Sequence, residues 1–162
     1  MMPRLLIVYH SLTGGTEAMA QAAFAGVEGV VNVSLKRAGE ATAADLLAAD
    51  GYIFAAPENL ATMAGVMKDF FDRTYYPALG RIEGRPYATM ICAGSDGEGA
   101  ARQIVRIATG WRLRAVADPL IICTHAQTPE AILAPKRISE ADLTRCRDLG
   151  AAMANGLAMG VF

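Results

Sequence analysis

Hydroxyl side chains and glycines follow the first apolar run of the chain, at a spacing that suits a phosphate group. Residues 5–8 are apolar, and the segment that follows contains Ser11, Thr13, Gly14, Gly15 and Thr16. The hydroxyls are hydrogen-bond donors, and the glycines allow the backbone to turn its N–H groups inward. A helix predicted to begin there adds the positive end of its dipole. Residues 11–16 include no Lys or Arg, so we expect neutral donors alone to hold the anion.

Residue type and spacing exclude three other phosphate loops. A Walker loop needs Lys before its Ser or Thr, where this chain has Gly15. The dinucleotide motif Gly-x-Gly-x-x-Gly does not match residues 11–16. A response-regulator receiver needs an acidic residue at the end of its first strand, and residues 9–11 contain none. An ordinary helix start, capped by Thr13 or Thr16, remains an alternative.

The pattern of apolar residues predicts strands that alternate with helices. Strands are expected at residues 4–10, 31–36, 51–56, 87–93 and 115–124. Helices are expected at residues 15–28, 43–49, 65–75 and 99–110, and from the cap at Ser139 to about residue 158. Residues 125–138 are expected to form a long loop. Near-continuous apolar strands with crossover helices predict an α/β fold with a doubly wound parallel sheet, in one domain over residues 1–162.

Two further polar or glycine-bearing loops follow the third and fourth predicted strands. The first comprises Pro57, Glu58, Asn59, Leu60, Ala61, Thr62 and Met63. The second comprises Ala93, Gly94, Ser95, Asp96, Gly97 and Gly99. Ligands of such a sheet bind beyond the carboxyl ends of its strands, so we expect these loops and residues 11–16 to converge on one site.

The composition indicates a compact enzyme-sized protein. The chain has 162 residues, of which 53% are hydrophobic and 19% charged, and its net charge is −1. This balance argues against nucleic-acid binding. Cys92, Cys123 and Cys146 have neither a disulfide nor a metal-site spacing, and residues 1–4 show no signal-peptide cleavage site. The longest uncharged stretch, residues 149–162, is too short to span a bilayer. We therefore expect a cytoplasmic protein with no metal and no membrane span.

The chain resembles the flavodoxin-like family. Within it, the resemblance is strongest to the small FMN-dependent NAD(P)H:quinone oxidoreductases and FMN reductases of the Trp-repressor-binding-protein type. Residues 11–16 are similar to the family's Ser/Thr-x-Thr-Gly-x-Thr loop, which binds the FMN phosphate. Residues 55–72 are similar to its flavin loop and following helix, notably at Pro57, Met63, Gly65, Met67, Phe70 and Asp72. Residues 94–99 stand where the third flavin loop belongs, and residues 135–142 are similar to the family's entry into the last helix.

The resemblance implies a five-stranded parallel sheet of order 2-1-3-4-5, FMN as cofactor, NAD(P)H as reductant, and a quinone or similar small acceptor. It implies that the three loops contact FMN, and it assigns no catalytic side chain. The backbone N–H groups of Ala61 and Thr62 would face the O4/N5 edge of the flavin, and residues 94–97 the pyrimidine edge. A homodimer or a tetramer is compatible with it.

Some positions depart from the family pattern. Leu60 stands where an aromatic residue is common, and Ala61 where Gly is common. The second and third loops contain no aromatic residue, so the flavin ring is expected to rest on Leu60 and Met63. Trp111 is expected to pack at a helix end, with capping of the site as the alternative.

Three other features are expected to lie at the surface. His10 and His125 follow predicted strands, where histidines usually form surface hydrogen bonds. Lys136 and Arg137 are expected to be a solvated pair, with attraction of an NADPH phosphate as the alternative.

A flavodoxin-type electron carrier is the alternative function. Such carriers tend to be strongly acidic, because a charged face steers docking to redox partners. Here 15 Lys and Arg residues balance 16 Asp and Glu residues, which favours the enzyme.

Overall fold

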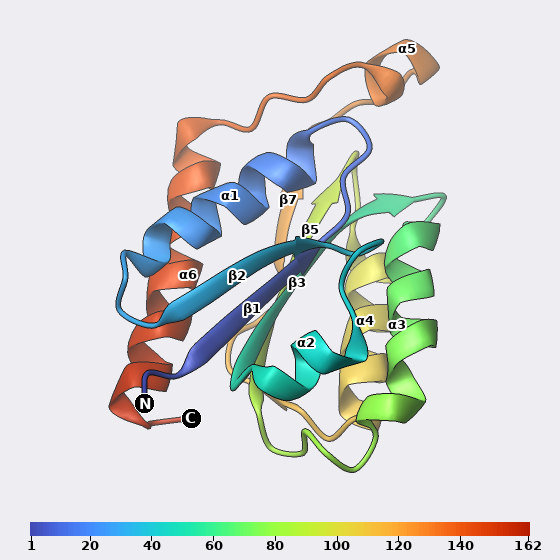
Figure 1. Ribbon diagram of the computed structural model, residues 1–162. Helices are drawn as coiled ribbons and strands as arrows, with labels where there is room; N and C mark the ends of the chain where they lie inside the picture. Colours follow the sequence, from blue (N-terminus) through green and yellow to red (C-terminus); the bar gives the residue numbers. More distant parts are fainter.

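A twisted parallel sheet runs through the computed structural model, which describes all residues from 1 to 162 (Figure 1). Its strands are β1 (Arg4–Tyr9), β2 (Asn32–Arg37), β3 (Gly51–Asn59), β5 (Pro86–Ala93), β6 (Arg114–Ala115) and β7 (Leu120–Cys123). Their order is β2-β1-β3-β5-β6, and β7 also pairs with β5. The two-residue β4 (Thr62–Met63) pairs antiparallel with the end of β3. The predicted doubly wound parallel sheet is confirmed.

Helices cover both faces of the sheet (Figure 1). One face packs against α1 (Gly15–Val27) and α6 (Glu140–Met159). The other packs against α2 (Ala43–Ala48), α3 (Gly65–Ala78) and α4 (Glu98–Gly110). A short helix, α5 (Pro129–Leu133), lies in the connection before α6. No helix combines the length and the apolar character needed to cross a bilayer.

Aromatic side chains fill the core beneath α3 and α4. Phe54 of β3 lies 5.3 Å from Phe71 and 6.4 Å from Trp111, between ring centroids. The Trp111 ring is fully buried and stacks on Tyr75, and its indole N–H donates to the Tyr75 carbonyl at 2.9 Å. Trp111 is therefore a packing residue at the end of α4, as expected, and the alternative that it caps the site is wrong.

Two glycines allow α1 and α6 to pack backbone against backbone. A Cβ atom on Gly150 of α6 would overlap the carbonyl of Ala23 in α1. A Cβ atom on Gly26 of α1 would overlap the carbonyl of Arg147 in α6. This close approach fixes α1, and with it the loop that leads into its first turn.

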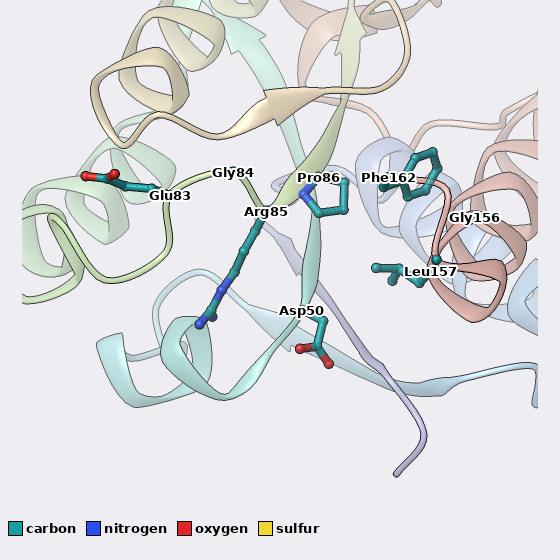
Figure 2. A pocket seen from close by; sticks show the side chains of 9 residues that line it. Asp50, Glu83, Gly84, Arg85, Pro86, Gly156, Leu157 and Phe162 are labelled. Carbon is teal, nitrogen blue, oxygen red and sulfur yellow. The ribbon is translucent and has the colours of Figure 1, made fainter.

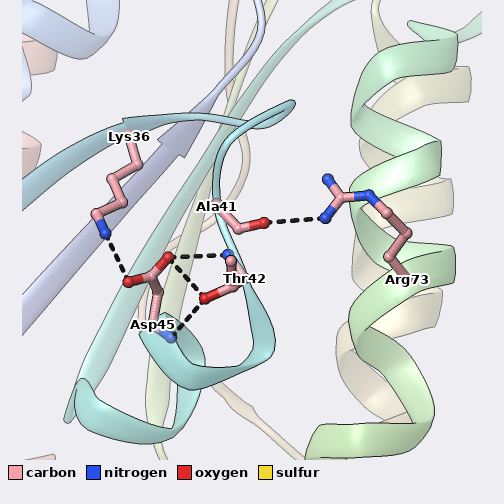
Figure 3. A network of polar contacts seen from close by, with 5 residues as sticks. All are labelled: Lys36, Ala41, Thr42, Asp45 and Arg73. Atoms are coloured by element: carbon pink, nitrogen blue, oxygen red, sulfur yellow. Dashed lines mark hydrogen bonds and ion pairs between the residues drawn. The ribbon is translucent and has the colours of Figure 1, made fainter.

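A polar network fastens the segment between β2 and α3 (Figure 3). Thr42 caps α2, because its hydroxyl accepts from the Asp45 N–H while the Asp45 carboxylate accepts from the Thr42 N–H. The Lys36 ammonium pairs with Asp45 at 2.6 Å. Burial acts to raise the Asp45 pKa, but these contacts outweigh it and the pKa is lowered. Arg73 of α3 donates to the Ala41 carbonyl at 3.0 Å, which ties this segment to α3.

The structure corrects three sequence-based expectations. The third strand does not end at residue 56 but continues to Asn59, so residues 58–63 form a hairpin rather than a loop. The strand expected at residues 115–124 is divided into β6 and β7, because Pro119 has no N–H for a sheet ladder. The loop expected at residues 125–138 contains α5, whose first turn Thr128 caps with its hydroxyl.

Candidate functional site

The loops that follow β1, β3 and β5 converge at one edge of the sheet. Two adjoining hollows lie between them. The first is lined by Ser11, Leu12, Thr13, Gly15, Thr16, Pro57, Asn59, Cys92 and Ile132. The second is lined by Thr13, Pro57, Glu58, Asn59, Cys92, Ala93, Gly94, Thr124, Ala126, Ile132 and Lys136.

The first loop leaves the start of α1 without a side-chain cap. The residue before the helix is Gly14, whose own N–H donates to the Ser11 hydroxyl at 3.1 Å. Neither Thr13 nor Thr16 caps the helix, so the alternative of an ordinary capped helix start is wrong. The first turn of a helix has N–H groups that lack partners inside the helix, and its dipole is positive there. The loop can therefore attract an anion.

The hydroxyl of Thr16 is buried at this helix start and lacks a hydrogen-bond partner. Its residue is 1% exposed. The Cys92 thiol lies beside it, but sulfur is a weak acceptor and the contact lacks hydrogen-bond geometry. An unsatisfied buried hydroxyl costs about 1–3 kcal/mol, so native proteins seldom keep one without a reason. A phosphate oxygen in this loop would satisfy it, and the residues present therefore fit a phosphate-bearing cofactor such as FMN.

The second loop is a strained two-residue turn. Leu60 and Ala61 connect β3 to β4 with φ angles of 52° and 65°. Two successive positive φ angles are typical of a type I′ hairpin turn, which Asn-Gly usually fills. For other L-residues the left-handed conformation costs roughly 1–2 kcal/mol each. The Leu60 side chain is 99% exposed, so the turn presents an apolar group to solvent at the mouth of the site.

Glu58 fastens the second loop to the third. Its carboxylate accepts the Gly97 N–H at 2.8 Å and the Ala100 N–H at 3.0 Å, and so serves as the missing cap of α4. A Cβ atom on Gly99 would overlap the Ala61 carbonyl, so Gly is required for this close approach. The second loop and the start of α4 therefore form one unit.

Residues 125–138, which we call the strap, close one side of the site. The Lys136 N–H donates to the Thr13 carbonyl at 2.8 Å. Its ammonium donates to the carbonyls of Ile132 and Ala134, both at 2.7 Å, and lies 3.4 Å from the Thr13 hydroxyl. The expectation of a solvated Lys136–Arg137 pair is wrong for Lys136, whereas Arg137 is exposed.

About half of the predicted site residues line the hollows. Those brought together are Ser11, Thr13, Gly15, Thr16, Pro57, Glu58, Asn59, Ala93 and Gly94. The other predicted residues do not line the hollows: Gly14, Leu60, Ala61, Thr62, Met63, Ser95, Asp96, Gly97 and Gly99. The Met63 side chain is 4% exposed and belongs to the core, so the expectation that a ring rests on it is wrong.

The sequence reasoning missed six lining residues. These are Leu12, Cys92, Thr124, Ala126, Ile132 and Lys136. Cys92 directly precedes a predicted site residue, and Thr124 ends a predicted strand, so both could have been included. Burial raises the pKa of the Cys92 thiol to about 11, against the opposing effect of Lys136, so this thiol is neutral near pH 7.

The two histidines follow strands, as expected. His10 is partly buried after β1, and burial, with Arg37 nearby, lowers its pKa, so it is neutral near pH 7. His125 is exposed, with a φ angle of 62°.

A separate hollow lies at the opposite end of the strands, near the starts of β3 and β5 (Figure 2). It is open, and Asp50, Arg85 and Phe162 are among its lining residues. The Arg85 guanidinium donates to the Ala49 carbonyl at 2.6 Å and to other carbonyls of the same turn. It therefore has a structural role, and the loops at the carboxyl ends of the strands remain the candidate site.

Known proteins support this assignment. Over 167 residues, the chain is 29% identical to a flavodoxin of Aquifex aeolicus, covering 99% of this chain and 90% of the relative. Over 95 residues it is 35% identical to an NAD(P)H dehydrogenase (quinone) of Acidithiobacillus ferrooxidans, covering 45% of this chain and 48% of the relative. An archaeal flavodoxin structure superposes with a TM-score of 0.77 at 21% identity, covering 95% of this chain and 98% of that one, and so shares its fold.

Residues 29–127, well over half of the chain, match the NADPH-dependent FMN reductase family. The matched segment contains both the hairpin that carries Leu60 and the loop that ends in the Glu58-capped helix. The predicted resemblance to flavodoxin-like FMN reductases is thus confirmed, and the chain belongs to the NADPH-dependent FMN reductase family.

Proposed function

We propose that the protein is an FMN-dependent NAD(P)H oxidoreductase that reduces quinones or similar small acceptors. The proposal rests on the buried Thr16 hydroxyl at the uncapped start of α1. This hydroxyl has no hydrogen-bond partner within the chain, and a bound phosphate would supply one. Membership of the reductase family supports the reaction type. The quinone dehydrogenase relative supports the acceptor, although the alignment spans about half of its length.

The proposed roles follow the loops, within one FMN-binding domain over residues 1–162. The phosphate would be held by Ser11, Thr13, Gly14, Gly15 and Thr16. The flavin ring would lie against the exposed part of the second loop, which comprises Pro57, Glu58, Asn59, Leu60, Ala61 and Thr62, whereas Met63 anchors that loop in the core. Its pyrimidine edge would meet Ala93, Gly94, Ser95, Asp96, Gly97 and Gly99.

When bound, FMN would accept two electrons from a nicotinamide nucleotide and pass them to the acceptor. The chain's own residues position the ring and leave one face open. No aromatic side chain lies in the three loops, and the exposed apolar groups at the site are Leu12, Leu60 and Ile132. Asp96 is exposed and accepts the Glu98 N–H at 3.3 Å, so water screens its charge from the pyrimidine edge.

The proposed partners are a nicotinamide nucleotide and a small acceptor. The net charge of −1 supports a protein that does not bind nucleic acid. The three free cysteines, of which Cys92 and Cys146 are buried, support a cytoplasmic location.

A flavodoxin-type electron carrier is the second candidate function. The Aquifex aeolicus flavodoxin favours it, because that alignment covers nearly all of this chain. The balance of 15 basic and 16 acidic residues favours the enzyme, since a carrier would benefit from a charged docking face.

A comparison of FMN with FAD tests the cofactor assignment. The first loop would surround a terminal phosphate, and the strap, whose Lys136 N–H donates to the Thr13 carbonyl, would hinder the second half of a pyrophosphate. We expect flavin-free protein to bind FMN at least about tenfold more tightly than FAD, a difference of roughly 1.4 kcal/mol. Equal affinity for the two flavins would contradict the phosphate site.

A further inference from the structure

The Lys136 ammonium forms two short hydrogen bonds within the strap, and its third hydrogen has only a distant acceptor. An ammonium group has three donor hydrogens. Two are committed to the carbonyls of Ile132 and Ala134, each at 2.7 Å. Its one further protein acceptor is the Thr13 hydroxyl, at 3.4 Å, which is a long and weak hydrogen bond. The remaining donor therefore points to the first loop, where Thr16 also lacks a partner.

Lys136 is held at this place by backbone contacts. Its N–H donates to the Thr13 carbonyl at 2.8 Å. Its Cβ atom lies 3.3 Å from the position that a Cβ on Gly15 would occupy. The side chain is partly buried, whereas the neighbouring Arg137 is exposed. Lys136 thus reaches the phosphate loop from the far end of the chain without a large side-chain rearrangement.

Lys136 is also the only cation at the two hollows. Their only other charged lining residue is Glu58. The Glu58 carboxylate already accepts the N–H groups of Gly97 and Ala100 at the start of α4. An anion in the first loop would therefore face one positive charge whose third hydrogen is nearly free. A charge-assisted hydrogen bond to a phosphate is roughly twice as strong as a neutral one.

We propose that Lys136 is a cofactor-binding residue that recognises the phosphate group of FMN and so discriminates FMN from riboflavin. The proposal rests on the proposed function, because it requires FMN as the ligand. It replaces the expectation that neutral donors alone hold the anion. The lysine also couples the strap to the first loop, since the group that contacts the phosphate is bonded to Ile132 and Ala134.

The test compares the affinities of flavin-free full-length protein for FMN and for riboflavin, measured by quenching of flavin fluorescence. The variants are Lys136→Met, which keeps the length of the side chain, and Lys136→Arg, which keeps the charge. Arg137→Met is the matched control, because it removes an exposed positive charge at the adjacent position. Circular dichroism and thermal melting establish that each variant is folded.

We expect Lys136→Met to weaken FMN binding by about 10- to 100-fold and to leave riboflavin binding within about twofold of wild type. Lys136→Arg should recover most of the FMN affinity, and Arg137→Met should change neither affinity by more than about twofold. An unchanged FMN-to-riboflavin ratio in Lys136→Met would overturn the proposal and leave the proposed function intact. A wild-type protein that binds neither flavin would overturn both.

Salt dependence gives a second measurement that does not depend on the folding of a variant. With the wild-type protein, added NaCl should weaken binding of FMN and leave that of riboflavin nearly unchanged, because salt screens the charge pair. Equal salt dependence for the two flavins would argue against a role for the lysine charge.

Discussion

The Glu58 carboxylate accepts the Gly97 N–H at 2.8 Å, and this contact joins the hairpin after β3 to the loop after β5. The second carboxylate oxygen accepts the Ala100 N–H at 3.0 Å. A single side chain thus caps α4 and fixes the relative position of two loops proposed to contact the flavin. Glu58 acts here as a positioning residue, and its role can be measured without any cofactor.

The first prediction concerns Glu58→Ala. The substitution leaves two N–H groups at the start of α4 without their acceptor, so the free energy of unfolding should fall by about 1–3 kcal/mol. Glu83→Ala is the control, because Glu83 is exposed and forms no hydrogen bond or ion pair through its side chain. Urea unfolding of the flavin-free proteins measures both. A loss for Glu58→Ala no larger than that for Glu83→Ala would show that the cap contributes little.

The second prediction separates stability from binding at Thr16. Thr16→Val removes a buried hydroxyl that has no partner, so the flavin-free protein should keep its stability or gain up to about 1 kcal/mol. FMN affinity should fall by about 10- to 100-fold, because a donor to the phosphate is lost. Calorimetric melting and flavin titration measure the two effects.

Thr89→Val is the matched control for this pair of measurements. The Thr89 hydroxyl is likewise buried without a partner, but it lies on β5 away from the loops. The substitution should affect stability in the same direction and leave FMN affinity unchanged. Wild-type FMN affinity in Thr16→Val would place the phosphate elsewhere.

The third prediction concerns the strained turn. Ala61→Gly removes the Cβ atom from a residue with a φ angle of 65°, so stability should rise by up to about 1 kcal/mol. The same substitution at Ala152, an exposed position within α6, should lower stability by about 1 kcal/mol. Chemical denaturation compares the two. A loss of stability in both variants would show that the turn is not strained at Ala61.

The fourth prediction concerns the thiols. Burial raises the pKa values of Cys92 and Cys146 to about 11, so both are protonated and shielded. Cys123 is partly exposed. A thiol-specific disulfide reagent at about pH 8 should therefore react quickly with one thiol per native chain, and with the others only after unfolding. Cys123→Ser should abolish the fast phase, and a fast phase that persists would contradict the assignment.

The sequence predicts the sheet and the three loops because their signals are local. Apolar runs of strand length and amphipathic helices identify the crossover pattern, and the strand ends then locate the site. Thr16 is identified from its position in the hydroxyl- and glycine-rich segment. The hairpin escapes prediction, since Leu60 and Ala61 replace the Asn-Gly pair that usually signals a type I′ turn.

The contact between Thr13 and Lys136 could not be predicted from local pattern. The two residues are 123 positions apart, and only the packing of α6 against α1 brings the strap over the first loop. The cap on α4 is similar, because Glu58 lies 39 positions before Gly97 and no local motif links them. Such long-range polar contacts depend on tertiary geometry.

The central claim, an FMN-dependent enzyme that uses NAD(P)H, is tested most directly by anaerobic reduction of the purified protein. The absorbance of bound FMN at about 450 nm should bleach when NADH or NADPH is added, and a small quinone should then restore it. No aromatic side chain in the three loops covers the ring, so the nicotinamide should be able to stack on it and transfer a hydride. Because a hydride carries two electrons, the bleaching should proceed as a single two-electron phase. If neither nucleotide bleaches the flavin, while dithionite reduces it in two separate one-electron phases, the protein is a carrier and the enzymatic assignment is contradicted.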